Sequence, residues 1–503
     1  YAKGEQLGTS IGLLNYVWDV QIARQIGYSF SVLHTVGYST IAIQEMNLAT
    51  KYPIIYWNTA CLSSNAGAIN EEDYFNLLNQ GVIDISDEED KRKANKVQYG
   101  KVAAAIGKFR HDLGVKIELP DINIARFGFT PNAQENSIVF GMKGVSRIGD
   151  ALINNIMDKR PYVSLNDFLD KMVEGNKKLI SKDRVINLIK AGAFDKVEKI
   201  PREQILMNYI NQIADKKNRV NLQNMLMLIR KGLLPSEFDE ESKIYMFTKY
   251  LRTNKFRGSY YILDDIAMEF YNERKYPQHK LQRLNNAGET ITVVSIGYWD
   301  SIYETSMNKV RDWMKRDQEK ILNQLNELLF KEEYEKYAEG NLLRWELDAL
   351  NFYHSGHELE GVAEQLPILI SKLDNIPDNE IIGEFNFDGK VFPKYQIRHI
   401  FGTVLDKDKQ KHLVTLSTPE GVINVKVYRT QFAKYDHVHS HFDEDNNKVV
   451  DEESFFKKGT FLVVSGIKRG DVFVPKVYRT TGVEVITKID VVDGKVKKAY
   501  NKS

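Results

Sequence analysis

The sequence predicts a multidomain α+β protein that is mostly helical over its first three quarters and all-β near its C-terminal end. With 503 residues, of which 43% are hydrophobic, the chain is long enough for two to four domains with cores of their own. Apolar residues recur at helical spacing over most of residues 1–380, whereas apolar and polar residues alternate over residues 385–490. This composition excludes a disordered chain, a collagen and a small disulfide scaffold.

The net charge points to no particular kind of partner. The 69 Lys and Arg residues balance 68 Asp and Glu residues, which gives +1, so a nucleic-acid site must be a local patch. The single cysteine, Cys61, cannot form an internal disulfide. The N-terminus YAKGEQLGTS lacks the layout of a secretory signal and no long apolar run occurs, so we expect a cytoplasmic protein with no membrane partner. The chain begins at Tyr1, which suggests a processed chain, a split gene product or one piece of a longer polypeptide.

The first predicted domain, residues 1–125, is mainly helical. Apolar runs at 11–26 and 32–48 indicate packed helices, and helical spacing resumes over 101–113. Between them, the mixed-charge block DISDEEDKRKANK has no apolar anchors, which favours a solvated loop or an exposed helix. The stretches LGVKIELPDINIARFGFT and SIVFGMKGV are strand-like.

Residues 126–200 have the layout of a tandem helix-hairpin-helix. In GMKGVSRIGDALINNI, the turn Gly144-Val145-Ser146 lies between two helical patterns and is flanked by Lys143 and Arg147. Such a turn can present backbone N–H groups and basic side chains to a phosphate, although a simple packing turn has the same appearance. A second unit ends in LIKAGAFD, which contains Lys190, and Gly192 there can close the helix in a left-handed conformation. Two such units would grip a DNA duplex without reading its sequence.

The rest of the chain divides into a helical region and a barrel. Residues 201–380 are expected to be a helical linker, interrupted by FRGSYYILDD and by GETITVVSIGYWDS, where residues 293–296 suggest a strand. Residues 385–490 contain about five short strands between turn signals, which is the strand number of an OB-type barrel, and 491–503 form a basic tail.

Aromatic and basic side chains on the barrel strands are candidates for binding single-stranded DNA, because bases stack on aromatic rings and cations attract phosphates. The alternative is that half of these aromatic residues point into the barrel core. The candidates are Tyr395, Arg398, Phe401, Lys426, Tyr428 and Lys468.

Several stretches resemble, in the same order, the C-terminal half of the bacterial DNA polymerase III alpha subunit, a C-family DNA polymerase. GYSFSVLHTVGYS is similar to the family's fingers motif, and LGVKIELPDINIARFGF followed by SIVFGMKGV is similar to the segment that leads into its helix-hairpin-helix. LIKAGAFD and RWELDALNFYHSGHEL also match. The resemblance covers roughly residues 1–200 and 340–485, and it implies fingers, tandem helix-hairpin-helix, clamp-proximal and OB-fold regions. A host or a phage origin stays open.

The resemblance also implies roles for individual residues. His34 and Tyr38 become candidates for the nucleotide pocket, although His34 could equally be a hydrogen-bonded helix histidine. The family's fingers Lys is Val32 here, and its second hairpin glycine is Ser146.

A sliding-clamp peptide is expected after the second hairpin, and Gln223, Leu226 and Met227 occupy that place. The stretch NLQNMLMLIRKGLL is equally plausible as a buried amphipathic helix.

Catalytic carboxylates are expected elsewhere. In the family, a D-x-D pair in an upstream palm domain holds the Mg²⁺ ions for nucleotidyl transfer, and no counterpart occurs in this chain. Asp84, Asp87 and Asp90 lie in the charged block, and Asp121 aligns with a non-catalytic position. We therefore predict no catalytic residue, no metal bound by this chain and no activity of the chain alone. His437, His439 and His441 alternate as zinc ligands on a strand do, but solvated histidines in an acidic loop are the favoured reading.

The sequence thus predicts the DNA-binding C-terminal portion of a replicative DNA-directed DNA polymerase, a nucleotidyltransferase. The expected partners are primer-template DNA, deoxynucleoside triphosphates, a palm-containing segment or subunit and a sliding clamp. The alternative is a stand-alone, non-catalytic DNA-binding subunit built from the same helix-hairpin-helix and OB modules.

Overall fold

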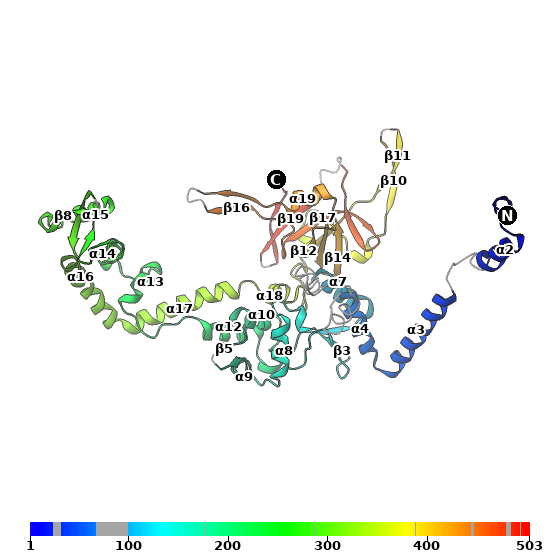
Figure 1. Ribbon diagram of the computed structural model, residues 1–503, viewed down its shortest axis with the longest axis horizontal. Coiled ribbons are helices and arrows are strands. Elements are labelled where there is room, and N and C mark those ends of the chain that lie inside the picture. The colour runs from blue at the N-terminus through cyan, green and yellow to red at the C-terminus, as the bar shows by residue number, and fades with distance from the viewer. Residues whose placement is uncertain are drawn as a thin grey trace. The chain divides into compact units, whose positions relative to one another are not determined.

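The structure is a computed structural model in which the chain forms two compact units. The first unit combines Tyr1–Arg202 with Gly340–Ser503, and the second is Glu203–Glu339. Figure 1 shows the course of the chain. The structure describes residues 1–23, 32–66, 99–175, 177–286, 288–387, 389–443, 447–478, 484–492 and 494–502.

The N-terminal helices are largely exposed in the part of the chain that the structure describes. None of α1 (Ala2–Gln6), α2 (Ile11–Asn15), the π-helix Tyr16–Ile22 and α3 (Val32–Lys51) contains a buried residue. The expected packing of these runs into a helical layer is therefore wrong for the part of the chain that the structure describes. Because the apolar residues of α3 are spread around the helix and not gathered in one stripe, its sequence indicated burial without specifying a partner.

Helix α4 (Ile54–Ala66) differs from the helices before it, because Ile55 and Leu62 are buried there. The charged block at 84–96 lies outside the described residues.

A small sheet and short helices form the module that follows α7 (Tyr99–Leu113). Strands β1 (Lys116–Glu118), β2 (Thr130–Asn132) and β3 (Ser137–Val139) pair in the order β1-β3-β2. They lead into the 3-10 turn Met142–Gly144. The strands β4 (Val173–Glu174) and β5 (Lys177–Lys178) form a short hairpin. The helices are α8 (Asp150–Asp158), α9 (Leu165–Lys171), α10 (Lys182–Lys190) and α11 (Asp195–Glu198).

Gly192 closes α10 as the sequence predicted. Its φ is +82°, and the N–H of Ala193 donates to the carbonyl of Leu188 at 3.0 Å. A Cβ at this position would lie 2.7 Å from the Arg202 guanidinium and 2.9 Å from Leu119, so the turn needs a glycine for space as well as for conformation.

The C-terminal region forms the closed five-stranded barrel that the alternating pattern predicted. The strands pair in the order β12-β13-β14-β18-β17, and a β12–β17 pairing closes the ring. Strands β14 and β18 run parallel, which is the pairing expected of an OB-type barrel, and α19 (Arg429–Asp436) connects β14 to the later strands. The barrel strands are β12 (Arg398–Asp408), β13 (Leu413–Thr418), β14 (Gly421–Lys426), β17 (Phe461–Arg469) and β18 (Val472–Pro475).

Two hairpins and a sheet extension belong to the barrel region. The hairpin of β10 (Ile381–Phe387) and β11 (Lys390–Tyr395) precedes the first barrel strand, and β15 (His439–Phe442) pairs with β16 (Lys448–Glu452). Strands β19 (Ile486–Val492) and β20 (Lys495–Tyr500) extend the sheet from β17, so much of the residue range expected as a basic tail is an edge strand.

The second unit contains more β-structure than its sequence suggested. Both predicted helix interruptions are strands, and the antiparallel sheet has the order β6-β7-β9-β8. Its strands are β6 (Lys255–Phe256), β7 (Tyr260–Ile262), β8 (Leu281–Asn286) and β9 (Glu289–Ser295). The helices are α12 (Arg202–Ile213), α13 (Met225–Arg230), α14 (Asp239–Leu251), α15 (Asp265–Glu273), α16 (Ile296–Arg316) and α17 (Gln318–Tyr337). Helix α18 (Leu342–Leu350) returns the chain to the first unit.

Candidate nucleic-acid interface

A groove of about 1780 Å³ in the first unit brings the hairpin module and the barrel together. Its lining comes from α7, from the turn and helices that follow residue 142, and from β12, β13 and β14. Nine Lys and Arg residues and five Asp and Glu residues line it, an excess of four positive charges in a chain whose net charge is +1. The groove is therefore a local basic patch, the kind of site that attracts phosphates.

Helix α7 lies directly on the barrel because glycines face the strands. A Cβ at Gly100 would meet Thr415 Oγ1 at 2.9 Å, and one at Gly107 would meet Val422 Cγ2 at 3.2 Å. The next residues, Lys101 and Lys108, are also seven apart, so they share one face of the helix and line the groove. Both side chains are exposed, and neither has a carboxylate partner among the described residues.

The hairpin side of the groove contributes Lys143, Arg147 and Arg184. Lys143 forms an ion pair with Asp150 at the start of α8 and lies over the Phe127 ring at 5.3 Å. Arg147 adopts a left-handed φ of +67°, and it and Arg184 are exposed without a carboxylate partner in the described parts of the chain. Two of the three cations are thus available to an anionic ligand.

The barrel side contains Lys407, Lys409, Lys411 and Lys468. Lys407 and Lys409 share Asp436, which Lys409 approaches at 3.3 Å. The groove carboxylates of Asp406 and Asp408 accept hydrogen bonds from backbone N–H groups, so part of their charge is already engaged.

The expected role of the first hairpin turn is wrong for the backbone N–H groups of Gly144, Val145 and Ser146. Gly144 and Val145 donate to Gly141 and Met142 at 3.0 and 3.1 Å, and Ser146 donates to the carbonyl of Ala349 at 2.8 Å. Donors that are engaged inside the protein are not free to hold phosphates. Val145 is fully buried, so the cations beside the turn, and not the turn itself, face the groove.

Ser146 fastens the turn to the C-terminal end of α18. Its hydroxyl donates to the carbonyl of Asp348 at 2.9 Å and accepts from the Asn351 amide at 3.2 Å. From the barrel, Lys458 donates to the same Asp348 carbonyl at 3.3 Å and also contacts Asn351. The last carbonyls of α18 are thereby capped from two modules at once.

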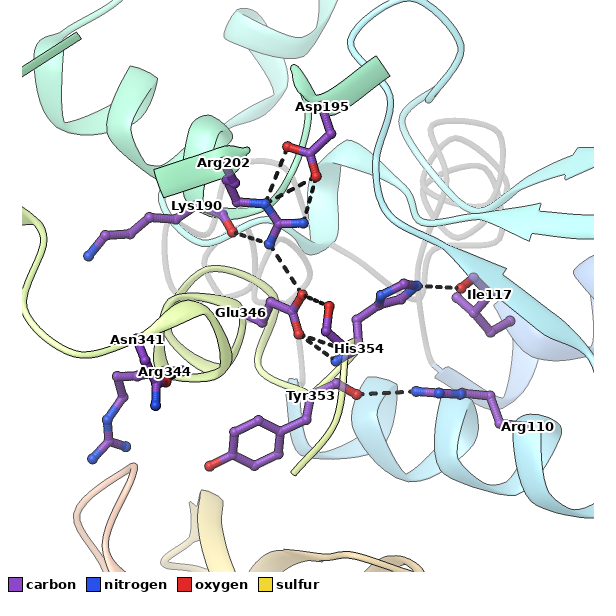
Figure 2. A network of polar contacts seen from close by, with 11 residues as sticks. Arg110, Ile117, Lys190, Asp195, Arg202, Asn341, Arg344, Glu346, Tyr353 and His354 are labelled. Atoms are coloured by element: carbon purple, nitrogen blue, oxygen red, sulfur yellow. Dashed lines mark hydrogen bonds and ion pairs between the residues drawn. The ribbon is translucent and has the colours of Figure 1, made fainter. Parts of the chain in front are cut away.

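A buried glutamate forms the centre of this connection (Figure 2). Glu346 is fully buried and accepts from Arg202 Nη1 at 3.2 Å, while Arg202 also pairs with Asp195 at 2.7 Å. The backbone N–H groups of His354 and Ser355 donate to Glu346 Oε2 at 2.8 and 2.9 Å, and the Ser355 hydroxyl donates to Oε1 at 2.6 Å. We call this set, with Ser146, Lys458 and His357, the joint.

His357 extends the joint into the barrel. The N–H of Leu359 donates to its Nδ1 at 3.1 Å, so Nε2 carries the hydrogen and donates to the Ser417 hydroxyl at 3.2 Å. Burial of the ring lowers the pKa of His357 to about 4, because the charged form loses its hydration.

The second hairpin residues also belong to the structural framework. The Lys190 ammonium lies 5.8 Å from the Trp345 ring, and its carbonyl accepts from Arg202 at 3.2 Å. Gly192 packs against Arg202, as described above. DNA contact by either residue stays a prediction.

The single-strand candidates divide into buried and exposed side chains. Phe401 is 3% exposed and packs in a core with Phe461 and Val463, so its predicted role in stacking is wrong. Arg398 pairs with Glu380 at 2.7 Å. Tyr428 is 61% exposed, Lys426 donates to the Lys411 carbonyl, and Lys468 lines the groove.

The remaining candidates are dispersed. His34 and Tyr38 are exposed on α3, and their rings stack with centroids 6.3 Å apart. In the second unit, Gln223 is exposed while Leu226 and Met227 pack partly against a core. Nucleotide and clamp contacts at these positions stay predictions.

The alternating histidines lie beside carboxylates on the β15–β16 hairpin. His439 and His441 approach Glu452 and Asp451 at 3.6 and 2.8 Å, and among the described residues no group of three or more potential ligands is arranged to hold a metal ion. In the same part of the chain, none of the helices is both long and apolar enough to cross a membrane.

The sequence reasoning missed Lys101, Lys108 and Arg184 as groove residues. The signal was present in GKVAAAIGK, where a Gly-Lys pair repeats after seven residues and therefore returns to the same helix face. Only the structure shows that the barrel meets this face.

Comparison with known proteins identifies the kind of protein to which this architecture is similar. A sequence profile described as a helix-hairpin-helix motif matches residues 114–205. The chain is 39% identical over 501 residues to the probable DNA polymerase YorL of Bacillus subtilis strain 168, and equally to the DNA-directed DNA polymerase of Bacillus phage SPbeta. These alignments cover 98% of this chain and 36% of each relative, so the chain spans about a third of their length.

A bacterial DNA polymerase III subunit matches a shorter stretch. The DNA polymerase III subunit alpha of Saccharopolyspora erythraea is 32% identical over 175 residues, which is 34% of this chain and 11% of that protein. The resemblance to the DNA polymerase III alpha subunit that the sequence motifs predicted is thereby confirmed.

Proposed function

We propose that this chain is the DNA-holding C-terminal portion of a replicative DNA-directed DNA polymerase, and that the groove holds primer-template duplex. The observation that carries the proposal is a set of four cations that α7 and the hairpin module place around one groove and that have no carboxylate partner among the described residues. They are Lys101, Lys108, Arg147 and Arg184. The similarity of nearly the whole chain to proteins named as DNA polymerases supports the same conclusion.

The chemistry of the groove is suited to binding duplex DNA independently of its base sequence. Its free cations reach phosphates, which are present along any DNA, and lysine and arginine neutralise them by releasing counterions. A replicative enzyme needs this sequence-independent contact, because it must hold every template equally well.

We infer that residues outside this chain carry out the catalytic step. A two-metal centre needs clustered carboxylates, and the described residues contain no such group. We infer that the complete polymerase supplies Mg²⁺ ligands and the deoxynucleoside triphosphate site through a palm segment or partner chain. The greater length of the relatives supports this inference.

The direct test compares a groove variant with a charge-matched control. Replacing Lys101, Lys108, Arg147 and Arg184 by Ala should weaken binding of a hairpin duplex, measured by fluorescence anisotropy at several salt concentrations. Each lost phosphate contact lowers the slope of log affinity against log salt by about 0.9. The control replaces four exposed lysines of α16 and α17 by Ala, namely Lys315, Lys320, Lys331 and Lys336. An equal slope for wild type and the groove variant would contradict the proposal.

A second test asks whether this chain contains the catalytic centre. The purified chain should show no primer extension with Mg²⁺ and deoxynucleotides, because the carboxylates for two metal ions are supplied elsewhere. Template-dependent extension by the pure chain would place the catalytic centre within it.

A further inference from the structure

The two sides of the groove differ in charge. Among the described residues that line it, the side made by α7 and the hairpin module contributes five cations and no carboxylate. The side made by the barrel and the preceding 3-10 turn Leu373–Asn375 contributes four lysines and all five carboxylates of the lining. These carboxylates belong to Asp374, Asp406, Asp408, Glu420 and Asp471. The excess positive charge of the groove therefore lies on the α7 and hairpin side.

The lysines of the barrel side are also engaged within the protein. Lys407 and Lys409 both pair with Asp436, which adds a sixth carboxylate to this side behind the lining residues. The Lys468 ammonium donates to a backbone carbonyl at 3.5 Å. The Lys411 ammonium has no carboxylate partner within the described chain, but its exposed side chain lies on the same turn as the groove carboxylates of β12. The barrel side therefore offers little net attraction to a phosphate.

Local hydrogen bonds hold two of the groove carboxylates in place without neutralising them. Asp408 Oδ1 accepts from two backbone N–H groups of the β12–β13 turn, at 2.9 Å each. Glu420 Oε2 accepts from the Thr418 hydroxyl at 3.0 Å. Neither of these carboxylates, nor that of Asp471, forms an ion pair with a lysine or arginine among the described residues. A negative charge fixed in this way repels a polyanion over about 10 Å at 0.1 M salt.

We propose that the carboxylates of Asp408, Glu420 and Asp471 confine the duplex to the α7 and hairpin side of the groove. The inference rests on the duplex-holding role proposed above. Phosphates are attracted by the free cations of one side and repelled by the carboxylates of the other, so the DNA contacts the groove through one side. One-sided contact also limits the affinity, which leaves the duplex able to advance along the groove after each nucleotide is added.

The first test removes the three charges and keeps the shapes of the side chains. The substitutions Asp408→Asn, Glu420→Gln and Asp471→Asn, together called the amide variant, retain an acceptor oxygen at each position. In fluorescence anisotropy at low salt, the full chain with these substitutions should bind a hairpin duplex about three- to tenfold more tightly than the wild type. The gain should shrink as salt is added, because salt screens the repulsion. Damage to the fold would lower the affinity, so it cannot mimic this result.

The matched control neutralises three exposed carboxylates of α15 by Asp265→Asn, Glu269→Gln and Glu273→Gln. It gives the chain the same net charge as the amide variant and should change duplex affinity by less than about twofold, because these charges do not line the groove. An equal gain in the control would show that net charge, and not its place in the groove, sets the affinity. That result would overturn the proposal, as would unchanged or weaker binding by the amide variant.

A second measurement asks whether the barrel side contacts DNA only when its carboxylates are neutralised. In the wild-type background, Lys411→Ala should leave the salt slope for duplex DNA unchanged, because the phosphates are held on the other side. In the amide variant, the same substitution should lower the slope by about 0.9, the value for one lost phosphate contact. Equal effects of Lys411→Ala in the two backgrounds would contradict one-sided binding.

The outcomes separate this inference from the proposed function. If the groove variant that lacks Lys101, Lys108, Arg147 and Arg184 binds the duplex as the wild type does, the duplex proposal fails. If that variant binds more weakly while the amide variant binds as the wild type does, the duplex lies in the groove and only its confinement to one side is wrong.

Discussion

The joint and the groove meet at the first hairpin turn, where Ser146 belongs to the joint while Lys143 and Arg147 line the groove. The two regions differ in how their charged groups are paired. In the joint, Glu346 is fully buried. Its two carboxylate oxygens form an ion pair with Arg202 and accept hydrogen bonds from His354 and Ser355. In the groove, Lys101 and Lys108 are exposed and have no carboxylate partner within the described chain.

This difference separates residues that hold the fold from residues that are free to bind. A buried charge is tolerated only when its partners are inside the protein, so a change there acts on stability. An exposed cation costs little to keep and little to remove, so a change there acts on a ligand. The two regions should therefore respond to substitution through different measurements.

The largest effect is expected at the centre of the joint. Glu346→Ala leaves the Arg202 guanidinium, whose side chain is 5% exposed, without one of its two carboxylates. Breaking a buried pair in this way destabilises by about 3–5 kcal/mol. Amide hydrogen exchange of α10 and α18 would measure the loss within this unit.

The control for that substitution is an exposed pair. Glu335→Ala removes the partner of Lys331, where both side chains are more than 60% exposed, and should change stability by less than about 1 kcal/mol. Equal effects at Glu346 and Glu335 would remove the distinction between joint and surface.

The next largest effect is the loss of stability at acid pH that His357 causes. The folded pKa of His357 is about 4, below the unfolded value of about 6.5, so the unfolded chain takes up its proton first as the pH falls. Stability from this group is therefore complete above pH 6.5 and is lost towards pH 4, by about 2–3 kcal/mol. The free energy of unfolding, measured in urea, should therefore fall less between pH 7 and pH 4.5 for His357→Gln than for the wild type. An NMR titration of His357 with a midpoint near 6.5 would refute the prediction.

A smaller effect is expected at the second hairpin turn. Gly192→Ala forces a side chain into a left-handed conformation and against Arg202, and should destabilise by about 1–3 kcal/mol. Gly232→Ala has a similar φ of +65° but open space around it, so it isolates the conformational part. Limited proteolysis in urea, with cleavage sites mapped, would compare the two units separately. A milder effect at Gly192 than at Gly232 would show that Arg202 does not constrain the turn.

The sequence predicted modules better than it predicted how they meet. Alternation over 385–490 predicted the barrel, and LIKAGAFD predicted the left-handed glycine, because both depend on local chemistry. Ser146 was expected beside a phosphate, yet its N–H is directed to Ala349, about 200 residues away along the chain. The alternating pattern did not predict on which face of its strand Phe401 lies. Residues on either face of a barrel strand can be buried, and Phe401 packs in a core with Phe461 and Val463.

The smallest expected effects are differences in salt slope between groove cations that have a carboxylate partner and those that have none among the described residues. Lys108→Ala should reduce the salt slope for duplex DNA by about 0.9. Lys143→Ala should reduce it by less, because Lys143 already pairs with Asp150. Anisotropy titrations over a range of salt would resolve this difference. A larger change for Lys143 would mean that its ion pair opens on binding.

The most direct test of the central claim is to ask where the duplex lies. In a Cys61→Ser background, a cysteine replaces Lys108 in the groove or Lys331 on α17, and the chain is mixed with duplex DNA that carries a thiol on a phosphate as an activated disulfide. The account predicts rapid cross-linking from position 108, which excess untethered duplex suppresses, and only slow, non-suppressible cross-linking from position 331. Equal cross-linking from both positions, or suppression at neither, would contradict the placement of DNA in the groove.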